Sequence, residues 1–301
     1  MTDSPQVTII EVSPRDGLQN ESSFVDTAIK IDFINQLSAS GLKHIEVTSF
    51  VSPKAIPQLA DNRAVYQGIN KAKDVHYSAL VPNEKGMLQA LDVGVKEIAI
   101  FTAASETFNQ RNINCSIAES IARYEPVMGL AKEHHIPVRA YISCVAGCPY
   151  EGSITPKQVA PIIEQLLDLG ADEISFGDTI GVGTPLQIKQ LIQSIAESMP
   201  LNQAAMHFHD TYGQAVANIY TALDSGIRRF DSAAAGLGGC PYAQGATGNV
   251  ATEDVLYLMH GMGVETGIDI YSVVKAGEMM CKAMKRKNQS KVANALLANP
   301  C

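Results

Sequence analysis

Two histidines separated by one residue are the strongest chemical signal in this sequence. His207 and His209 end a run, from Ala204 to His209, that has the composition of a β-strand. Alternate residues of a strand point to the same face, so the two imidazoles would lie roughly 6–7 Å apart, a spacing that a metal ion can bridge. An isolated His-x-His is more often structural or merely exposed, so a metal site needs further ligands.

Two oxygen donors elsewhere in the chain could complete such a site. Asp16 follows the first β-like run, and closure of a barrel would bring that run close to the seventh and eighth strands. Asn249 could add a carbonyl oxygen. Two imidazoles with oxygen donors suit a divalent cation of intermediate hardness, and the share of oxygen favours Mg or Mn over a closed Zn site.

Further polar residues occur where strands are expected to end. Arg15 follows the first strand, Glu46 lies on the second and Asp178 follows the sixth. In a (β/α)8 barrel the chemistry takes place at the carboxyl ends of the strands. Arg15 and Asp16 could equally form a surface ion pair, and Glu46 could be a polar residue of a barrel layer. These polar residues are all expected at the same end of one barrel, and this coincidence favours an active site there.

A glycine-rich segment from Gly236 to Asn249 follows the eighth strand. It holds five glycines in fourteen residues, which indicates a mobile loop that could close over a barrel mouth as a lid. No lysine follows in P-loop register, so a phosphate cradle is disfavoured. Cys240 lies within this lid and is a candidate acid or base; the alternative is an ordinary small residue.

The elements that must position these residues alternate along the chain: a short β-branched run, a turn, then a segment of helical periodicity. Eight runs are predicted as strands: Val7–Val12, His44–Thr48, His76–Val81, Glu97–Phe101, Val138–Ser143, Glu173–Phe176, Ala204–His209 and Arg229–Ala233. The helical segments between them include Ala28–Ala39, Ile117–Glu133, Pro156–Leu169, Pro185–Glu197 and Ala215–Asp224. Gly41, Gly170 and Gly226 follow three of these helices and suit left-handed C-caps.

This alternation predicts an α/β fold, a (β/α)8 TIM barrel with a glycine-rich lid loop and additional C-terminal helices. An open doubly wound sheet would show a similar alternation over fewer units. Because no linker splits the chain, we expect one catalytic domain over residues 1–301. Its barrel core would cover about 7–236, the lid 236–249, and helices covering one face 253–301.

Composition excludes several classes of protein. The chain of 301 residues has a net charge of −8 and no basic cluster, so a nucleic-acid partner is not expected. No secretory signal and no apolar run approaching roughly 18 residues is visible, so we expect a soluble, cytoplasmic protein without a membrane partner. The six cysteines show no CxxC pairing and are interpreted as reduced thiols.

Several segments together resemble 3-hydroxy-3-methylglutaryl-CoA (HMG-CoA) lyases over nearly the whole chain. The segments that carry the resemblance are Val12–Glu21, Thr48–Lys54, Asn112–Ser116, Gly177–Thr184 and the lid, Gly236–Asn249. The Arg-Asp-Gly motif alone marks a wider family of metal-dependent lyases and synthases, whereas the lid and Asn112–Ser116 are much more specific. The resemblance implies a Mg- or Mn-dependent barrel that cleaves HMG-CoA into acetyl-CoA and acetoacetate, a step of leucine degradation and ketone-body metabolism. It also implies a homodimer.

The resemblance also assigns roles to individual residues. The implied metal ligands are Asp16, His207, His209 and Asn249; the implied catalytic residues are Arg15 and Cys240, supported by Glu46, Asp178 and Glu253. Residues expected to bind the acyl-CoA substrate are Arg15, Gln19, Ser49, Asn112, Tyr141 and Thr179. Ser22 departs from the family, which often has lysine there, and this puts one contact to the CoA moiety in doubt.

Chemical reasoning agrees with these roles. A bound cation would lower the pKa of the substrate's tertiary hydroxyl, Arg15 would stabilise the charge that develops at the thioester oxygen, and Cys240 would protonate the acetyl carbanion. The base that takes the hydroxyl proton stays open among Asp16, Asp178 and Glu253.

Two alternative functions stay open. One is a related lyase for a longer branched 3-hydroxyglutaryl-CoA, such as an isohexenylglutaryl thioester, and the other is a non-catalytic barrel that binds acyl-CoA or a partner protein. A condensing synthase of the isopropylmalate type is disfavoured, because such enzymes continue into a regulatory domain.

Overall fold

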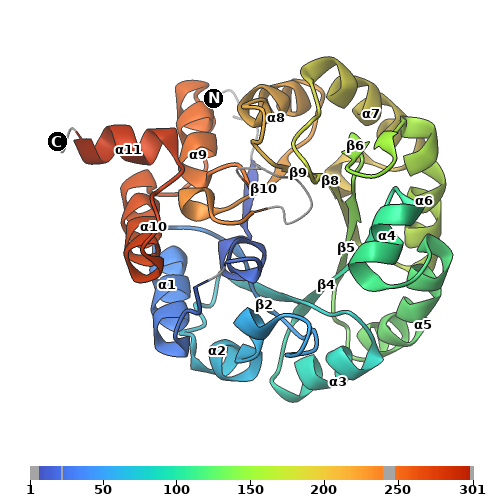
Figure 1. Cartoon of the computed structure of the whole chain (residues 1–301), viewed down its shortest axis with the longest axis horizontal. Helices are drawn as coiled ribbons and strands as arrows, with labels where there is room; N and C mark the ends of the chain where they lie inside the picture. The colour runs from blue at the N-terminus through green and yellow to red at the C-terminus, as the bar shows by residue number, and fades with distance from the viewer. Residues whose placement is uncertain (1–6, 22, 240–247, 299–301) are drawn as a thin grey trace.

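A computed structural model describes residues 7–21, 23–239 and 248–298. Within these residues, eight parallel strands close into a barrel in the order β1-β10-β9-β8-β5-β4-β3-β2, and the helices form a ring around it (Figure 1). The barrel strands are β1 Thr8–Glu11, β2 His44–Ser49, β3 His76–Leu80, β4 Glu97–Ala103, β5 Val138–Ser143, β8 Glu173–Asp178, β9 Ala204–Phe208 and β10 Arg229–Ser232. The predicted (β/α)8 barrel is therefore confirmed, and all eight predicted strands are present.

The helices follow the strands in alternation. Their bounds are α1 Thr27–Ala39, α2 Asn62–Gly68, α3 Glu84–Asp92, α4 Glu106–Ile113, α5 Ile117–Glu133, α6 Pro156–Leu169, α7 Pro185–Ser198, α8 Ala215–Asp224, α9 Thr252–Gly261, α10 Ile270–Met284 and α11 Lys291–Ala298. Short turns complete the described elements: η1 Ser13–Gly17, η2 Pro57–Leu59, η3 Leu201–Gln203 and η4 Ala234–Gly236. A small hairpin joins β6 Gly147–Cys148 to β7 Gly152–Ser153.

Local sequence explains why the helix predictions were accurate. Prolines at the first helical position begin α6 and α7, where a missing N–H costs nothing. Each is preceded by a threonine that forms a capping box with a glutamine three residues later. At the other end, Gly41, Gly170 and Gly226 have φ angles of 100°, 103° and 104°, the left-handed conformation predicted for them.

The apolar core lies between the barrel wall and the helices. Phe33 of α1, Phe176 of β8 and Phe230 of β10 are among its fully buried side chains. The C-terminal helices α9, α10 and α11 lie together on the outside of the barrel, between α8 and α1 (Figure 1). No helix in the described part of the chain is long and apolar enough to cross a membrane.

Candidate active site

The first strand ends in an unusual turn that carries two of the predicted site residues. Over Ser13–Gly17 the backbone forms a single π-helical turn, in which the N–H groups of Asp16 and Gly17 both donate to the Val12 carbonyl. Such turns are rare and frequent at functional sites. A Cβ on Gly17 would lie 2.9 Å from Cβ of Leu237, so glycine is what lets the turn approach the start of the lid.

A buried glutamate, Glu11, holds this turn against the end of β10. Its carboxylate accepts hydrogen bonds from the N–H groups of Ser13 (3.0 Å) and Ala234 (2.9 Å) and from the Thr252 hydroxyl (2.7 Å). Burial raises the pKa of Glu11. These bonds fix where the first strand leads, and therefore where Arg15 and Asp16 lie.

Arg15 lies between two carboxylates and an aromatic ring. Its Nε donates to Glu46 of β2, its Nη1 lies 2.7 Å from Asp16 Oδ1, and its Cζ lies 5.4 Å from the ring centre of Tyr141. The Tyr141 hydroxyl donates to the second oxygen of Glu46 at 3.0 Å. Burial opposes the charge of Arg15, but Glu46 and Asp16 outweigh it and raise the pKa of Arg15. The guanidinium is therefore a permanent, fixed positive charge.

Asp16, His207 and His209 converge as predicted. One potential ligand atom from each lies within 4.8 Å of those from the other two. Burial disfavours ionisation of Asp16, yet Arg15 and the two histidines lower the pKa of Asp16 to about 2. Burial, with the neighbouring His207, lowers the pKa of His209 to about 4. At neutral pH the group therefore offers a carboxylate and, at His209, a neutral imidazole.

The donor set fits a divalent cation. His209 Nδ1 is buried and has no hydrogen-bond partner among the described residues. His207 Nδ1 lies 3.2 Å from Asp231 Oδ2, which leaves its Nε2 for a ligand. A ligating histidine almost always donates its other ring N–H to such a partner. The Asn249 side-chain nitrogen donates to Asp16 at 2.8 Å, so its amide lies beside this cluster with its nitrogen, not the predicted carbonyl oxygen, directed at Asp16.

A chain of polar contacts inside the barrel joins the arginine to the histidines. Arg139 donates to Tyr141 at 3.1 Å and to Asp231 at 2.6 Å. Ser175 donates to the same aspartate at 2.9 Å. Burial opposes ionisation of Asp231, but Arg139 and His207 lower its pKa. Sequence reasoning missed Arg139 and Asp231; the available signal was a charged residue inside each of two short β-like runs.

Two of the predicted polar residues are bonded to backbone groups of nearby loops. Asp178 accepts hydrogen bonds from the N–H groups of Val182 (3.1 Å) and Gly183 (2.8 Å). Burial raises the pKa of Asp178 to about 6. Glu253 of α9 accepts from the N–H of Ala235 at 2.9 Å, and burial raises its pKa to about 8. Ala235 has a φ of 59°, so Glu253 supports a left-handed turn at the start of the lid.

The predicted substrate-binding residues lie on β2 and β5, or after β1, β4 and β8. Ser49 ends β2, and Thr179 follows β8 and accepts from the Cys144 N–H at 2.8 Å. Asn112 is exposed on α4, and Gln19 is partly buried after the π-helical turn. Tyr141 lies within the polar network already described. Cys240 falls outside the described residues.

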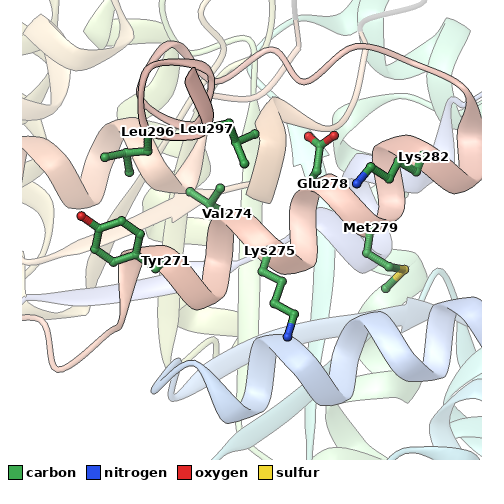
Figure 2. Close-up of a pocket in the computed structure, with 8 residues that line it drawn as sticks. All are labelled: Tyr271, Val274, Lys275, Glu278, Met279, Lys282, Leu296 and Leu297. Atoms are coloured by element: carbon green, nitrogen blue, oxygen red, sulfur yellow. The ribbon is translucent and has the colours of Figure 1, made fainter. Parts of the chain in front are cut away.

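A groove of about 820 Å³ lies elsewhere, on the outside of the barrel. It runs along α10 and is bounded by α11 (Figure 2). Its lining includes Tyr271, Val274, Met279 and Leu297, and none of the candidate site residues. The chemistry-bearing groups therefore gather at the carboxyl end of the strands and not in this groove.

Comparison with known proteins agrees with this geometry. The family model described as HMGL-like matches residues 6–280. A Pseudomonas aeruginosa protein named 3-hydroxy-3-isohexenylglutaryl-CoA/hydroxy-methylglutaryl-CoA lyase is 54% identical over 97% of this chain and 98% of its own. A rat protein named 3-hydroxy-3-methylglutaryl-CoA lyase, cytoplasmic, is 55% identical over 96% of this chain and 84% of its own. A bovine protein named hydroxymethylglutaryl-CoA lyase, mitochondrial, is 52% identical over 96% of this chain and 89% of its own.

Solved structures give the same result. The crystal structure of hydroxymethylglutaryl-CoA lyase from Pseudomonas aeruginosa is 53% identical, covers 99% of both chains and superposes with a TM-score of 0.96. An HMG-CoA lyase from Acinetobacter baumannii in complex with coenzyme A and 3-methylmalate is 37% identical over 98% of this chain and 96% of its own, with a TM-score of 0.93. Fold, site and sequence thus agree, and this chain belongs to the HMGL-like family.

Proposed function

We propose that this chain cleaves HMG-CoA into acetyl-CoA and acetoacetate in a reaction that depends on a divalent metal. The observation that carries the proposal is the convergence of Asp16, His207 and His209 beside the buried charge of Arg15. The names of the relatives, at 54% and 55% identity over nearly the whole chain, support the same substrate.

Asp16, His207, His209 and Asn249 would hold the cation. Oxygen donors beside two imidazoles favour Mg²⁺ or Mn²⁺ over Zn²⁺. When bound, such a cation acts as a Lewis acid that lowers the pKa of a coordinated hydroxyl. The low pKa of Asp16, about 2, keeps this carboxylate ionised, and so a ligand, across the neutral range.

Arg15 supplies the second electrostatic element of the reaction. Breaking the carbon–carbon bond leaves negative charge on the thioester oxygen, and a fixed guanidinium stabilises that charge as it develops. Glu46 and Tyr141 hold Arg15 in place, so we assign Glu46 a positioning role. Cys240, in the lid segment, would donate the proton that the acetyl carbanion requires.

Asp178 and Glu253 position nearby backbone segments, and the proton of the tertiary hydroxyl would pass to one of the candidate bases, Asp16, Asp178 or Glu253. Both Asp178 oxygens accept backbone N–H groups of the segment after β8, and a Cβ on Gly181 would lie 2.7 Å from the His209 carbonyl oxygen. Asp178 therefore supports the segment that packs against His209. Glu253 accepts a hydrogen bond from the Ala235 N–H and so supports the turn before the lid.

A coupled assay for acetoacetate release tests this proposal. The purified chain should release acetoacetate from HMG-CoA with Mg²⁺ or Mn²⁺ and lose that activity with excess chelator. Cys240→Ser should lower kcat with little change in KM or metal content. A chain that holds metal and coenzyme A but releases no acetoacetate would instead be a non-catalytic acyl-CoA-binding barrel.

A second activity, on a longer branched thioester, is favoured by one observation. The name of the Pseudomonas aeruginosa relative includes 3-hydroxy-3-isohexenylglutaryl-CoA. The same assay should therefore compare kcat/KM for HMG-CoA and for this homologue. We also propose a homodimer, which sedimentation can test, and a cytoplasmic location, which the name of the rat relative supports and that of the bovine relative does not.

A further inference from the structure

A second group of two histidines and a carboxylate lies at the opposite end of the barrel. His44, His76 and Glu97 are the first residues of β2, β3 and β4. One potential ligand atom from each lies within 4.8 Å of those from the other two. The amino end of a (β/α)8 barrel generally contributes stability rather than catalysis. The reaction proposed above uses none of these three residues.

Strand register brings the three side chains together. β2 and β3 pair in register, with His44 opposite His76, and their rings stack with centres 4.6 Å apart and planes 8° from parallel. Because an imidazole binds a metal in the plane of its ring, one of the two rings must turn before both can ligate the same ion, and the exposed His76 has room to do so. β3 pairs with β4, and Glu97 Oε2 lies 3.6 Å from His76 Nδ1. Because side chains alternate along a strand, His44 shares the inward face of β2 with Glu46. The group therefore lies at the amino end of the barrel.

The exposure and the donor types of the group suit a bound cation. The His76 side chain is 63% exposed, so ions and water reach the group from solvent. Two imidazoles and one carboxylate are the protein ligands of open Zn²⁺ sites, in which water takes the fourth position.

The two nearby arginines are paired with carboxylates. Arg139 Nε lies 2.7 Å from Glu173 Oε1, and Arg229 pairs with the other oxygen of the same carboxylate. Arg139 also pairs with Asp231 at 2.6 Å. These carboxylates offset part of the guanidinium charge, although both arginines still lower the pKa of His44.

We propose that His44, His76 and Glu97 form a second metal site, which takes a divalent transition cation of the Zn²⁺ class. Its higher share of imidazole selects Zn²⁺, Co²⁺ or Ni²⁺ over the Mg²⁺ or Mn²⁺ expected at the other end. A cation held by β2, β3 and β4 ties three neighbouring strands together. Because it binds the folded chain, it raises the free energy of unfolding.

Co²⁺ titration of the full chain tests the proposal, because tetrahedral Co²⁺ reports its ligands by visible absorption. In a His207→Ala/His209→Ala background, which removes the first site, we expect one equivalent of Co²⁺ to bind and to raise the thermal midpoint. Adding His76→Gln should weaken this binding at least about tenfold. His134→Gln, at an exposed histidine of the helical ring, is the matched control and should leave it unchanged.

A second measurement does not depend on that background. In the otherwise unaltered chain, equilibrium dialysis with elemental analysis should show two equivalents of Co²⁺, falling to one in either His76→Gln or Glu97→Gln. Circular dichroism establishes that each variant is folded. One equivalent in the unaltered chain, or full retention in both variants, would overturn the second site. Neither result bears on acetoacetate release, so the two proposals fail separately.

Discussion

At the carboxyl end of the barrel, His207 is held by the buried Asp231, and Asp16 is paired with Arg15. At the amino end, His44 and His76 stack on each other, and the pKa of Glu97 is raised by burial. The two ends thus carry the same types of donor in different surroundings.

The difference teaches what separates the site proposed for catalysis from the site proposed only to bind a cation. The pKa of Asp16 is lowered to about 2 by neighbouring cationic groups despite its burial, so its charge is present at any working pH. Asp231 fixes the ring of His207 and selects which nitrogen faces the site. These partners preorganise the carboxyl end, and Arg15 adds a charge for the transition state. The amino end has the same types of donor but no equivalent of Arg15.

The largest effect is expected from removing a ligand at the carboxyl end. His207→Ala should lower kcat by about 10³-fold or more, because several kcal/mol of Lewis-acid stabilisation are lost and each 1.36 kcal/mol is about tenfold. Elemental analysis should show loss of Mg²⁺ or Mn²⁺ and retention of Co²⁺ at the other end. Full retention of Mg²⁺ or Mn²⁺ would contradict the assignment of His207.

Removing the fixed charge separates electrostatics from metal binding. Arg15→Ala should lower kcat by about 10²-fold with little change in KM or metal content, because Arg15 acts on charge that develops in the transition state. Arg15→Lys keeps the charge and loses the planar contacts to Glu46 and Asp16, so it should recover activity only in part. A change confined to KM would argue against this role.

Changing the residue behind His207 tests preorganisation directly. Asp231→Asn keeps the side-chain shape but weakens the bond that orients His207, so metal affinity at the carboxyl end should fall about 10-fold to 100-fold. It also breaks the buried pair with Arg139, so the free energy of unfolding should fall. Isothermal titration with Mn²⁺ measures the first effect and urea denaturation the second. If metal affinity fell equally at both ends of the barrel, Asp231 would be acting only through the stability of the fold.

The smallest effect concerns a buried carboxyl in acidic surroundings. Burial, with the nearby Glu11 and Asp254, raises the pKa of Glu253 to about 8 from 4.5. Between these values the folded chain keeps a proton that the unfolded chain releases, so stability falls as pH rises through this window. Glu253→Gln should remove that loss and raise the free energy of unfolding at pH 8 by at most about 4 kcal/mol, with little effect at pH 4. Urea denaturation at both pH values measures it, and an equal effect at both would refute the assigned protonation.

Sequence reasoning predicted the elements, and the nearness of Asp16, His207 and His209, for reasons that are local. Proline at N1 and glycine after the last turn mark helix ends, and the bounds of α6 were predicted to the residue. His207 and His209 share a face because strands alternate, and Asp16 follows the strand that barrel closure brings near them. The single-domain prediction and the roles of the site residues stay predictions.

The missed residues depend on distant contacts. Arg139 and Asp231 are 92 residues apart and form no motif, and charged residues are seldom fully buried unless paired. The π-helical turn at Ser13–Gly17 depends on Glu11, which bonds to residues more than 220 positions away. The second metal site combines His44, His76 and Glu97 from three strands, and its spacing matches no metal motif.

The amino-acid sequence by itself determined the alternation of strands and helices, the shared face of His207 and His209, and the family to which the chain belongs, because these depend on residue types and short spacings. Only the tertiary structure decided which partner each buried charge has. Closing the barrel sets β1 beside β10 and β2 beside β3. The same donor types thereby lie beside Arg15 and Asp231 at one end and beside Arg139 and Arg229 at the other. These neighbours set the charge and the orientation of the donor side chains.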